Sequence, residues 1–293
     1  MTNPAALHWL TGTTYLDETD VLDVIHEATG GCEFLVIEGS KWAYRKRYKT
    51  VEGIEVMVEP SQPDTMPPVC VNVPGTACEF LGADRLQQVA SILKPTRVDF
   101  AWDAVPFSVE QLGAWVDQGD MRSRFRSASM HETIMGKGGE TVTLGSREST
   151  AQIAVYDRRG PVRLEMRLRG ERAELVFDVL MSSPVEWASS FLGVLRGLVD
   201  FVDRSHTSRA DRAPLLPLWE SFIEGAERCV VALAGTVAPS LERVRSWVEH
   251  QVAKRLYMLD EAGIKVTDFL KLGRSRMRRS DRVMLTGWRA LSP

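Results

Sequence analysis

The spacing of hydrophobic and polar positions changes repeatedly along the 293-residue chain, and each change predicts an element. Apolar residues at helical spacing predict helices over 17–30, 83–93 and 108–119. Short alternating or apolar runs separated by Pro and Gly predict strands over 7–15, 33–39, 44–50, 54–60, 67–75, 96–103, 132–135, 142–144, 153–156 and 162–168. From residue 170 almost to the C-terminus the pattern is mainly helical.

The order of these elements is strand, helix, strands, helix, and then a similar succession again. It predicts an α+β fold with a mainly antiparallel central sheet, built from two loosely similar halves with packed helices. A helical and basic C-terminal region follows. The segment 205–217 is rich in Arg, Asp and Pro and is the best linker candidate. We therefore expect an α+β domain over 1–204 and a C-terminal region over 205–293 that packs on it.

Charge and composition narrow the class of protein. The formal net charge is −3, so any contact with nucleic acid depends on a local basic patch rather than on the whole chain. No apolar run approaches the roughly 18 residues that cross a bilayer, and the N-terminus lacks the basic and apolar regions of a signal peptide. The four cysteines have no zinc-binding spacing. These features predict a cytoplasmic protein with no membrane partner.

The stretch TRVDFAWDA, if it is a strand, presents Arg97, Asp99 and Asp103 on one face and apolar residues on the other. On an ideal flat strand the two carboxylates would be about 13 Å apart, too far for both to hold one ion. Asp99 alone, or Asp103 after a bend, is then the better metal ligand. Considered by itself, the stretch is more simply a strand whose charges face the solvent.

The stretch VRLEMRLRG alternates strictly, which predicts a half-buried strand with Arg163, Glu165 and Arg167 on one face. A carboxylate within a row of guanidinium groups can hold a metal, anchor an arginine or face water. Surface ion pairs are common and contribute little. Considered by itself, this strand also favours the plain surface interpretation.

The stretch IAVYDRRG places Tyr156 opposite the apolar Ile153 and Val155, on the same kind of polar face. Most such tyrosines only pack and find a hydrogen-bond partner. Near carboxylates and Arg158, however, a tyrosine can act as a nucleophile. A divalent ion on the carboxylates would polarise a phosphodiester, and the arginines would offset its developing charge. The combination fits phosphotyrosyl transfer on nucleic acid.

Two further features can contact phosphates. The turn at Gly145, Ser146 and Arg147 offers backbone amides and a guanidinium, although such turns are common. The tail from Lys271 to Arg289 concentrates basic residues, among them Arg276, Arg278 and Arg279. A solvated helix with a cationic end is the simpler interpretation, but in an acidic chain this concentration favours DNA contact.

In their order and spacing, LHWLTGTTY, TRVDFAWD, VTLGSREST, IAVYDRRG and VRLEMRLRGERA resemble the replication initiation factor family of the Rep_trans type. That family includes rolling-circle plasmid and phage replication initiators and relaxases of conjugative elements. The resemblance implies site- and strand-specific nicking of DNA with covalent attachment through tyrosine. It covers roughly the first two-thirds of the chain well, and the helical tail is also similar.

Carried over by position, the resemblance implies Tyr156 as the nucleophile, with Arg158 and Arg97 as catalytic residues. It also matches Asp99, Asp103, Glu165 and Arg163, and the turn at Gly145, Ser146 and Arg147, to the family motifs. The oxygen ligands of Asp99, Asp103 and Glu165 favour Mg²⁺ or Mn²⁺. The expected DNA contacts are Gly145, Ser146, Arg147, Arg163, Arg167, Arg276, Arg278 and Arg279, the last three because of their local charge. The expected partner is an origin or transfer origin, single-stranded at the nick; a host helicase and a second copy of the chain are further candidates. The alternative is a non-catalytic, sequence-specific DNA-binding regulator on the same scaffold.

Overall fold

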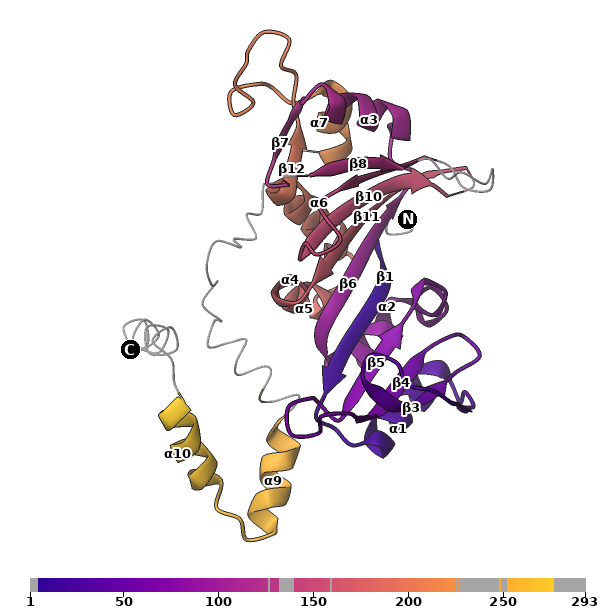
Figure 1. The fold of residues 1–293 in the computed structure, drawn as a ribbon, viewed down its shortest axis with the longest axis vertical. Helices are drawn as coiled ribbons and strands as arrows, with labels where there is room; N and C mark the ends of the chain where they lie inside the picture. Colours follow the sequence, from indigo (N-terminus) through magenta and orange to yellow (C-terminus); the bar gives the residue numbers. More distant parts are fainter. Residues whose placement is uncertain are drawn as a thin grey trace. The chain divides into compact units, whose positions relative to one another are not determined.

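The computed structural model describes residues 5–125, 127–131, 140–158, 160–224, 226, 248 and 252–276. The chain divides into two units, Met1–Val231 and Ala232–Pro293. The first unit is built on a ten-stranded antiparallel sheet with the order β2-β3-β4-β5-β1-β6-β11-β10-β9-β8 (Figure 1). Helices pack on this sheet, so the predicted α+β fold is confirmed.

The sheet consists of two halves with the same succession of strands. The first half contains β1 (Ala5–Thr14), β2 (Leu35–Ile37), β3 (Tyr44–Lys49), β4 (Glu55–Pro60) and β5 (Val69–Val73). The second contains β6 (Lys94–Asp103), β8 (Ala128–His131), β9 (Thr141–Leu144), β10 (Ala151–Asp157) and β11 (Val162–Arg169). In each half the last strand pairs with the first: β5 with β1, and β11 with β6. The pairing of β1 with β6 joins the two halves. The two similar halves expected from the sequence are therefore present.

The helices begin and end at recognisable signals. They are α1 (Glu18–Thr29), α2 (Gly75–Ser91), α3 (Val109–Asp117), α4 (Glu171–Leu175), α5 (Phe177–Met181), α6 (Glu186–Leu198) and α7 (Pro217–Ile223). Ser108 and Gln111 form a capping box at the start of α3. Helix α2 begins eight residues before the predicted residue 83, and it is kinked at Gly82 (φ 68°). The kink explains why periodicity revealed only its second segment.

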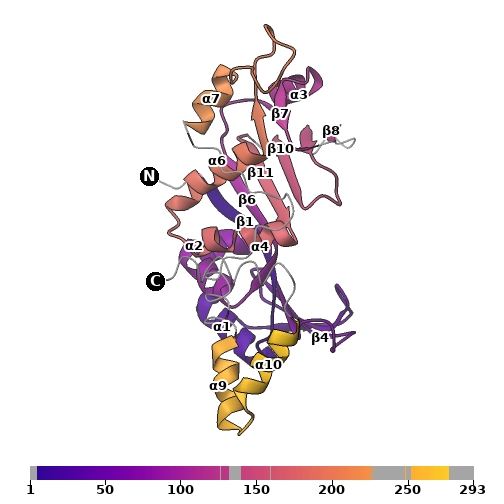
Figure 2. The same ribbon diagram turned by 90° about the vertical axis from the view of Figure 1, so that its left-hand side faces the viewer.

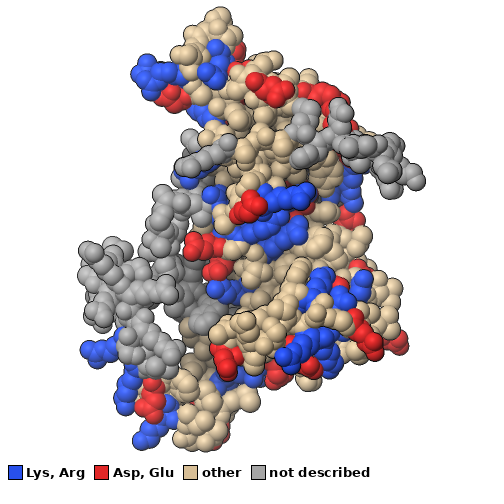
Figure 3. All heavy atoms as spheres, viewed as in Figure 1, with Lys and Arg blue, Asp and Glu red and all other residues tan. Residues whose placement is uncertain are grey.

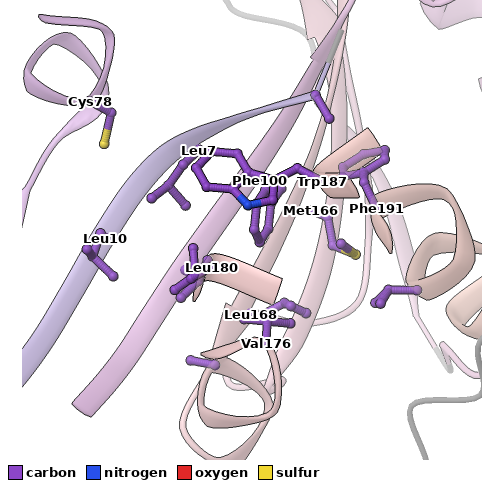
Figure 4. Packing of buried hydrophobic residues seen from close by; sticks show 14 of the residues in the cluster. Leu7, Leu10, Cys78, Phe100, Met166, Leu168, Val176, Leu180, Trp187 and Phe191 are labelled. Carbon is purple, nitrogen blue, oxygen red and sulfur yellow. The ribbon is translucent and has the colours of Figure 1, made fainter. Parts of the chain in front are cut away.

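The core lies between the sheet and one layer of helices. Helices α1, α2, α4 and α6 lie on one face of the sheet (Figure 2), and α5 packs against α2 and α6. There, Leu7, Phe100 and Met166 from the three central strands point toward Trp187 and Phe191 of α6 (Figure 4). The Phe100 and Trp187 rings meet edge to face, 5.9 Å apart. The opposite face of the sheet, which we call the open face, carries the polar positions of the same strands.

The first unit extends beyond residue 204, where we expected the domain boundary. A second sheet pairs β7 (Met121–Ser123) with β12 (Val199–Phe201), a strand that the helical pattern after residue 170 concealed. Helix α7 then returns to the core, where Trp219 is fully buried and packs against Phe201. The segment 205–217 is therefore a loop within the unit, which ends at Val231.

The second unit contains α9 (Ala253–Glu261) and α10 (Val266–Arg276), in agreement with the predicted helical region. The expected strand over 132–135 lies outside the described residues. Within the part of the chain that is described, no helix has the length and apolar character needed to cross a membrane.

Candidate active site on the open face

Strands β6, β11 and β10 bring the predicted site residues of the sheet together. Register pairs Asp99 with Arg167, Asp103 with Arg163, and Arg163 with Tyr156. Because side chains alternate along a strand, these residues share the open face while Val98, Phe100 and Leu164 enter the core. Figure 3 looks onto the open face and shows Lys and Arg gathered across its middle, with Asp and Glu among them.

Glu165 lies at the centre of this group. Its Oε2 accepts hydrogen bonds from the Tyr156 hydroxyl (3.1 Å) and from Nη2 of Arg167 (2.9 Å). The residue is only 3% exposed. Burial by itself would raise the pKa of Glu165, but hydrogen bonds from His8 and Arg167 outweigh burial and bring that pKa to about 2. Glu165 is therefore a buried and charged acceptor beside the tyrosine hydroxyl.

His8 belongs to the site, and sequence reasoning did not find it. Its Nδ1 lies 3.2 Å from Oε1 of Glu165, and since that carboxylate is charged, the imidazole N–H donates. The register of β1 against β6 shifts between Leu7 and Trp9, a bulge that directs His8 onto the open face. A Cβ on Gly75 would lie 2.4 Å from Nε2 of His8, so the first residue of α2 must be glycine for the ring to fit. A single histidine within a predicted strand does not reveal from the sequence that its ring contacts a carboxylate on another strand.

Arg97 and Asp99 form an ion pair on β6. Arg97 donates through Nε (3.0 Å) and Nη2 (2.5 Å) to the two carboxylate oxygens of Asp99, and its guanidinium lies 4.4 Å from the ring centre of Trp9. Asp99 is fully buried. Burial raises the pKa of Asp99, Arg97 partly opposes this effect, and the nearby Glu165 charge adds to it. Asp99 is thus close enough to Glu165 for the two charges to interact.

Asp103 is held by arginines at the far end of β6. Nε and Nη2 of Arg163 donate to its two oxygens at 2.6 and 2.7 Å, and Nη1 of Arg158 lies 3.6 Å away. The Arg163 hydrogen bonds keep the pKa of Asp103 below its usual range. Arg158 also donates to Glu79 of α2 at 2.5 Å. The predicted catalytic Arg158 therefore contacts two carboxylates, and neither is Glu165.

The carboxylates of the open face fit the expected divalent ion in residue type, but arginines already occupy their oxygens. Among the described residues, no group of three or more His, Cys, Asp or Glu side chains is arranged to hold a metal. Asp103 is engaged by Arg163. Asp99 and Glu165 are buried neighbours that supply oxygen, with His8 beside Glu165. Carboxylate oxygens suit Mg²⁺ or Mn²⁺, so the residue types fit, although an ion would compete with Arg97 and Arg167 for the same oxygens.

The remaining predicted DNA contacts lie elsewhere. The turn at Gly145, Ser146 and Arg147 precedes β10, whereas Tyr156 lies near the end of that strand. Five residues separate Ala151 from Tyr156, which is about 17 Å along a strand. The turn is therefore not beside the tyrosine. Arg276 ends α10 in the second unit, while Arg278 and Arg279 lie outside the described residues.

Comparison with known proteins places the chain in a class. The family model of the replication initiation factor, Rep_trans, matches residues 93–272, more than half of the chain. The match includes the site residues on β6, β10 and β11, but not His8 and Trp9. The protein belongs to the replication initiation factor family.

Two individual proteins show this similarity. The putative DNA relaxase NicK of Bacillus subtilis (strain 168) is 26% identical over 203 residues, which cover 61% of this chain and 55% of the relative. The chain thus matches about half the length of that relative. The structure of a rolling circle replication initiator protein from Geobacillus stearothermophilus superposes with a TM-score of 0.63 at 21% identity, covering 78% of this chain and 98% of that one. This likeness establishes the shared fold.

Proposed function

We propose that this protein makes a site-specific single-strand nick in DNA, as a rolling-circle replication initiator or a relaxase, with Tyr156 as the nucleophile. The observation that carries the proposal is the hydrogen bond from the Tyr156 hydroxyl to the buried, charged Glu165. Arginines on the same face surround this pair. Membership of the replication initiation factor family supports the same chemistry.

The proposed step exchanges one phosphodiester bond for another. The Tyr156 oxygen attacks phosphorus, the bond from phosphorus to the 3′ oxygen breaks, and the 5′ phosphate becomes esterified to tyrosine. The tyrosine loses its hydroxyl proton, and the departing 3′ oxygen gains one. Burial and the Glu165 charge raise the pKa of Tyr156, so the hydroxyl is protonated in the resting state. Glu165 is the acceptor already in place for that proton.

Arginine charges would stabilise the transition state. Arg163 is paired with Tyr156 in register, and Arg167 donates to the same Glu165 oxygen as the tyrosine. Both would lie near a phosphate bound at Tyr156 and offset the extra negative charge of the phosphorane. Asp99 and Glu165, with His8 nearby, are the residues that would hold Mg²⁺ or Mn²⁺. When bound, such an ion would polarise the phosphodiester and stabilise the leaving oxygen.

We further propose that the open face holds the strand that is cut, while the basic end of the second unit, with Arg276, contacts duplex DNA through its phosphates. Helix α10 carries exposed basic residues, including Lys271 and Arg274. A host helicase and a second copy of the chain remain candidate partners in the same proposal. The cytoplasm is the expected compartment.

A covalent adduct is the direct test. Overlapping single-stranded oligonucleotides that together cover the origin or transfer origin, each labelled at the 3′ end, are incubated with the full-length chain and Mg²⁺ or Mn²⁺ and run on a denaturing gel. The label should migrate with the protein, because tyrosine retains the 5′ phosphate of the 3′ fragment; a 5′ label should be released instead. If the wild-type chain binds DNA without forming an adduct, the non-catalytic regulator is the correct function.

A further inference from the structure

Arg169, the last residue of β11, differs from the other arginines of the open face. It lies directly opposite Arg97 of β6. Its Nη1 is buried, and within the described residues this atom has no hydrogen-bond partner. Like charges directly opposite each other on neighbouring strands are destabilising. Arg97 is already bonded to Asp99, whereas Nη1 of Arg169 has no such partner among the described residues, so an anion that reached this atom would stabilise the Arg169 side chain.

The two ends of β11 differ in their balance of charge. Near Tyr156, arginines are matched with carboxylates: Arg163 with Asp103 and Arg167 with Glu165. At the other end, Thr150 accepts a hydrogen bond from the Arg169 backbone N–H (2.8 Å) and, through its hydroxyl, one from Arg172 (3.0 Å). The exposed Arg147 lies in the turn just before Thr150. Three arginines, Arg147, Arg169 and Arg172, therefore lie at this end of β11. The nearby Asp99 is bonded to Arg97, and Glu148 is exposed in the turn, so among the described residues none of the three arginines has a carboxylate partner.

Burial has the largest effect on the charge of Arg169. It lowers the pKa of Arg169, and the charge of Arg97 lowers that pKa further, while the charges of Asp99 and Glu165 oppose the change in part. Burial likewise lowers the pKa of Arg172, with a contribution from Arg124. A phosphate group would reverse this unfavourable balance, since charge-assisted hydrogen bonds from guanidinium to phosphate are among the strongest in proteins.

We propose that Arg169 and Arg97 form a second phosphate-binding position, which holds the DNA backbone at the end of β11 away from Tyr156. The inference rests on the proposed function for the identity of the polymer. Arg163 is opposite Tyr156 and six residues before Arg169, so the two positions are about 20 Å apart along the strand. Several nucleotides would span that distance. The bound single strand then follows β11 instead of crossing the sheet.

The test measures binding without nicking. Full-length chain is titrated with fluorescein-labelled oligothymidylate of about 20 nucleotides, long enough to cover one such groove, in EDTA and over a range of salt concentrations. Arg169→Ala should weaken binding at low salt by roughly tenfold, the scale of one lost charge-assisted contact. It should also reduce the log–log salt slope by about 0.7, the value for one single-strand phosphate. Arg169→Lys should retain most of the slope.

Arg85→Ala is the matched control, because Arg85 is an exposed cation on α2, on the helix-covered side of the sheet. It should leave the slope unchanged. Thermal stability provides a second readout: since Arg169→Ala removes a like-charge contact, the melting temperature should stay equal or rise. An unchanged slope, an equal loss in Arg85→Ala, a lowered melting temperature, or no binding by the wild type would each overturn the inference. The adduct test is independent of all four results, so failure of one proposal is distinguishable from failure of the other.

Discussion

The two halves of the sheet share their succession of strands, yet the polar residues on their open faces have different partners. In the first half, Tyr44 packs in a small buried cluster with Met57 and Cys70, and its hydroxyl donates to the Pro67 carbonyl (3.0 Å). Burial raises the pKa of Tyr44 to about 12. In the second half, Tyr156 is half-buried and its hydroxyl donates to a charged carboxylate. A tyrosine bonded to a backbone carbonyl secures packing, whereas one bonded to a carboxylate has an acceptor for its proton.

The carboxylates of the two faces show the same contrast. Glu55 on β4 is buried and accepts hydrogen bonds from Lys41, Arg47 (3.4 Å) and Asn72 (3.4 Å). Its described partners include no tyrosine. Glu165 has a tyrosine, a histidine and an arginine around its two oxygens. Each half of the scaffold therefore places a buried carboxylate on the open face, and its neighbours determine whether it is positioned to accept a proton from a tyrosine.

The largest expected effect separates the two tyrosines. Tyr156→Phe should reduce adduct formation by roughly 10⁴-fold or more, the scale on which loss of a nucleophile acts, with DNA affinity near normal and a loss of about 1 kcal/mol of stability, because Glu165 loses one of its donors. Tyr44→Phe should retain adduct formation and lose about 1 kcal/mol of stability, because the Pro67 carbonyl loses its donor. Denaturing gels and thermal melts of both variants measure this. Nicking by Tyr156→Phe would show that the nucleophile has been misassigned.

Glu165 and Glu55 should differ in their effect on adduct formation, as the two tyrosines do. Glu165→Gln and Glu55→Gln should each destabilise the fold by about 3 kcal/mol, because each leaves buried cations without their charge partner. Only Glu165→Gln should also slow adduct formation, by about 100-fold, the usual weight of a proton acceptor. Denaturant titrations combined with single-turnover nicking give both quantities. Equal slowing in the two variants would mean that stability, not the site, controls the rate.

Acid titration should reveal the low pKa of Glu165. The folded value of about 2 lies below the ordinary 4.5, so the charged carboxylate stabilises the fold fully above about pH 4.5. This contribution is lost as the pH falls from 4.5 toward 2. The difference in free energy of unfolding between wild type and Glu165→Gln should therefore shrink by up to about 3 kcal/mol over that window. Carboxylates common to both proteins cancel in the difference, and a flat difference would contradict the assignment.

The smallest effect is expected at Trp9, which contacts both halves. Its indole N–H donates to Asn72 (2.9 Å) and Thr11 (3.1 Å) of the first half, while Arg97 of the second half stacks on its ring. Trp9→Phe keeps a ring for the arginine and removes the hydrogen bonds. We expect a loss of about 1 kcal/mol in urea titrations, with adduct formation little changed. A large loss of nicking would place Trp9 in direct contact with DNA.

Alternation and periodicity predicted the fold class and the strands that carry the site. Tyr156, Glu165 and Asp99 were placed on polar strand faces because period-2 patterns assign the face of each residue directly. Which strands are neighbours depends on the crossing from β6 to β11, and the family resemblance, rather than the pattern, implied that proximity. Whether these residues nick DNA and bind a metal remains a prediction.

Other features depend on tertiary contacts that leave little trace in local sequence. The bulge that turns His8 toward Glu165 is set by pairing with β6, ninety residues away at Trp9 and Asp99. The strand β12 follows a helix without a break in hydrophobicity, so its pattern continued the helical prediction. Helix α7 follows a segment with linker composition, yet Trp219 fills a pocket of aromatic rings in the first unit. In each case the deciding partner lies far along the chain.

The pairing of β1 with β6 also has a consequence for how the protein reaches its native state. The outer strands of each half pair through short hairpins, whereas β1 with β5, β6 with β11 and β1 with β6 pair across long loops. In this sheet, the pairing of β1 with β6 joins the positions farthest apart in sequence, and it forms slowly because the entropic cost of closing its loop precedes its contacts. His8 meets Glu165 across the same seam, 157 positions apart in sequence. A refolding chain should thus regain most of its secondary structure before the proposed nicking activity. Competence to cut DNA would then appear only with the last and slowest cooperative phase of folding.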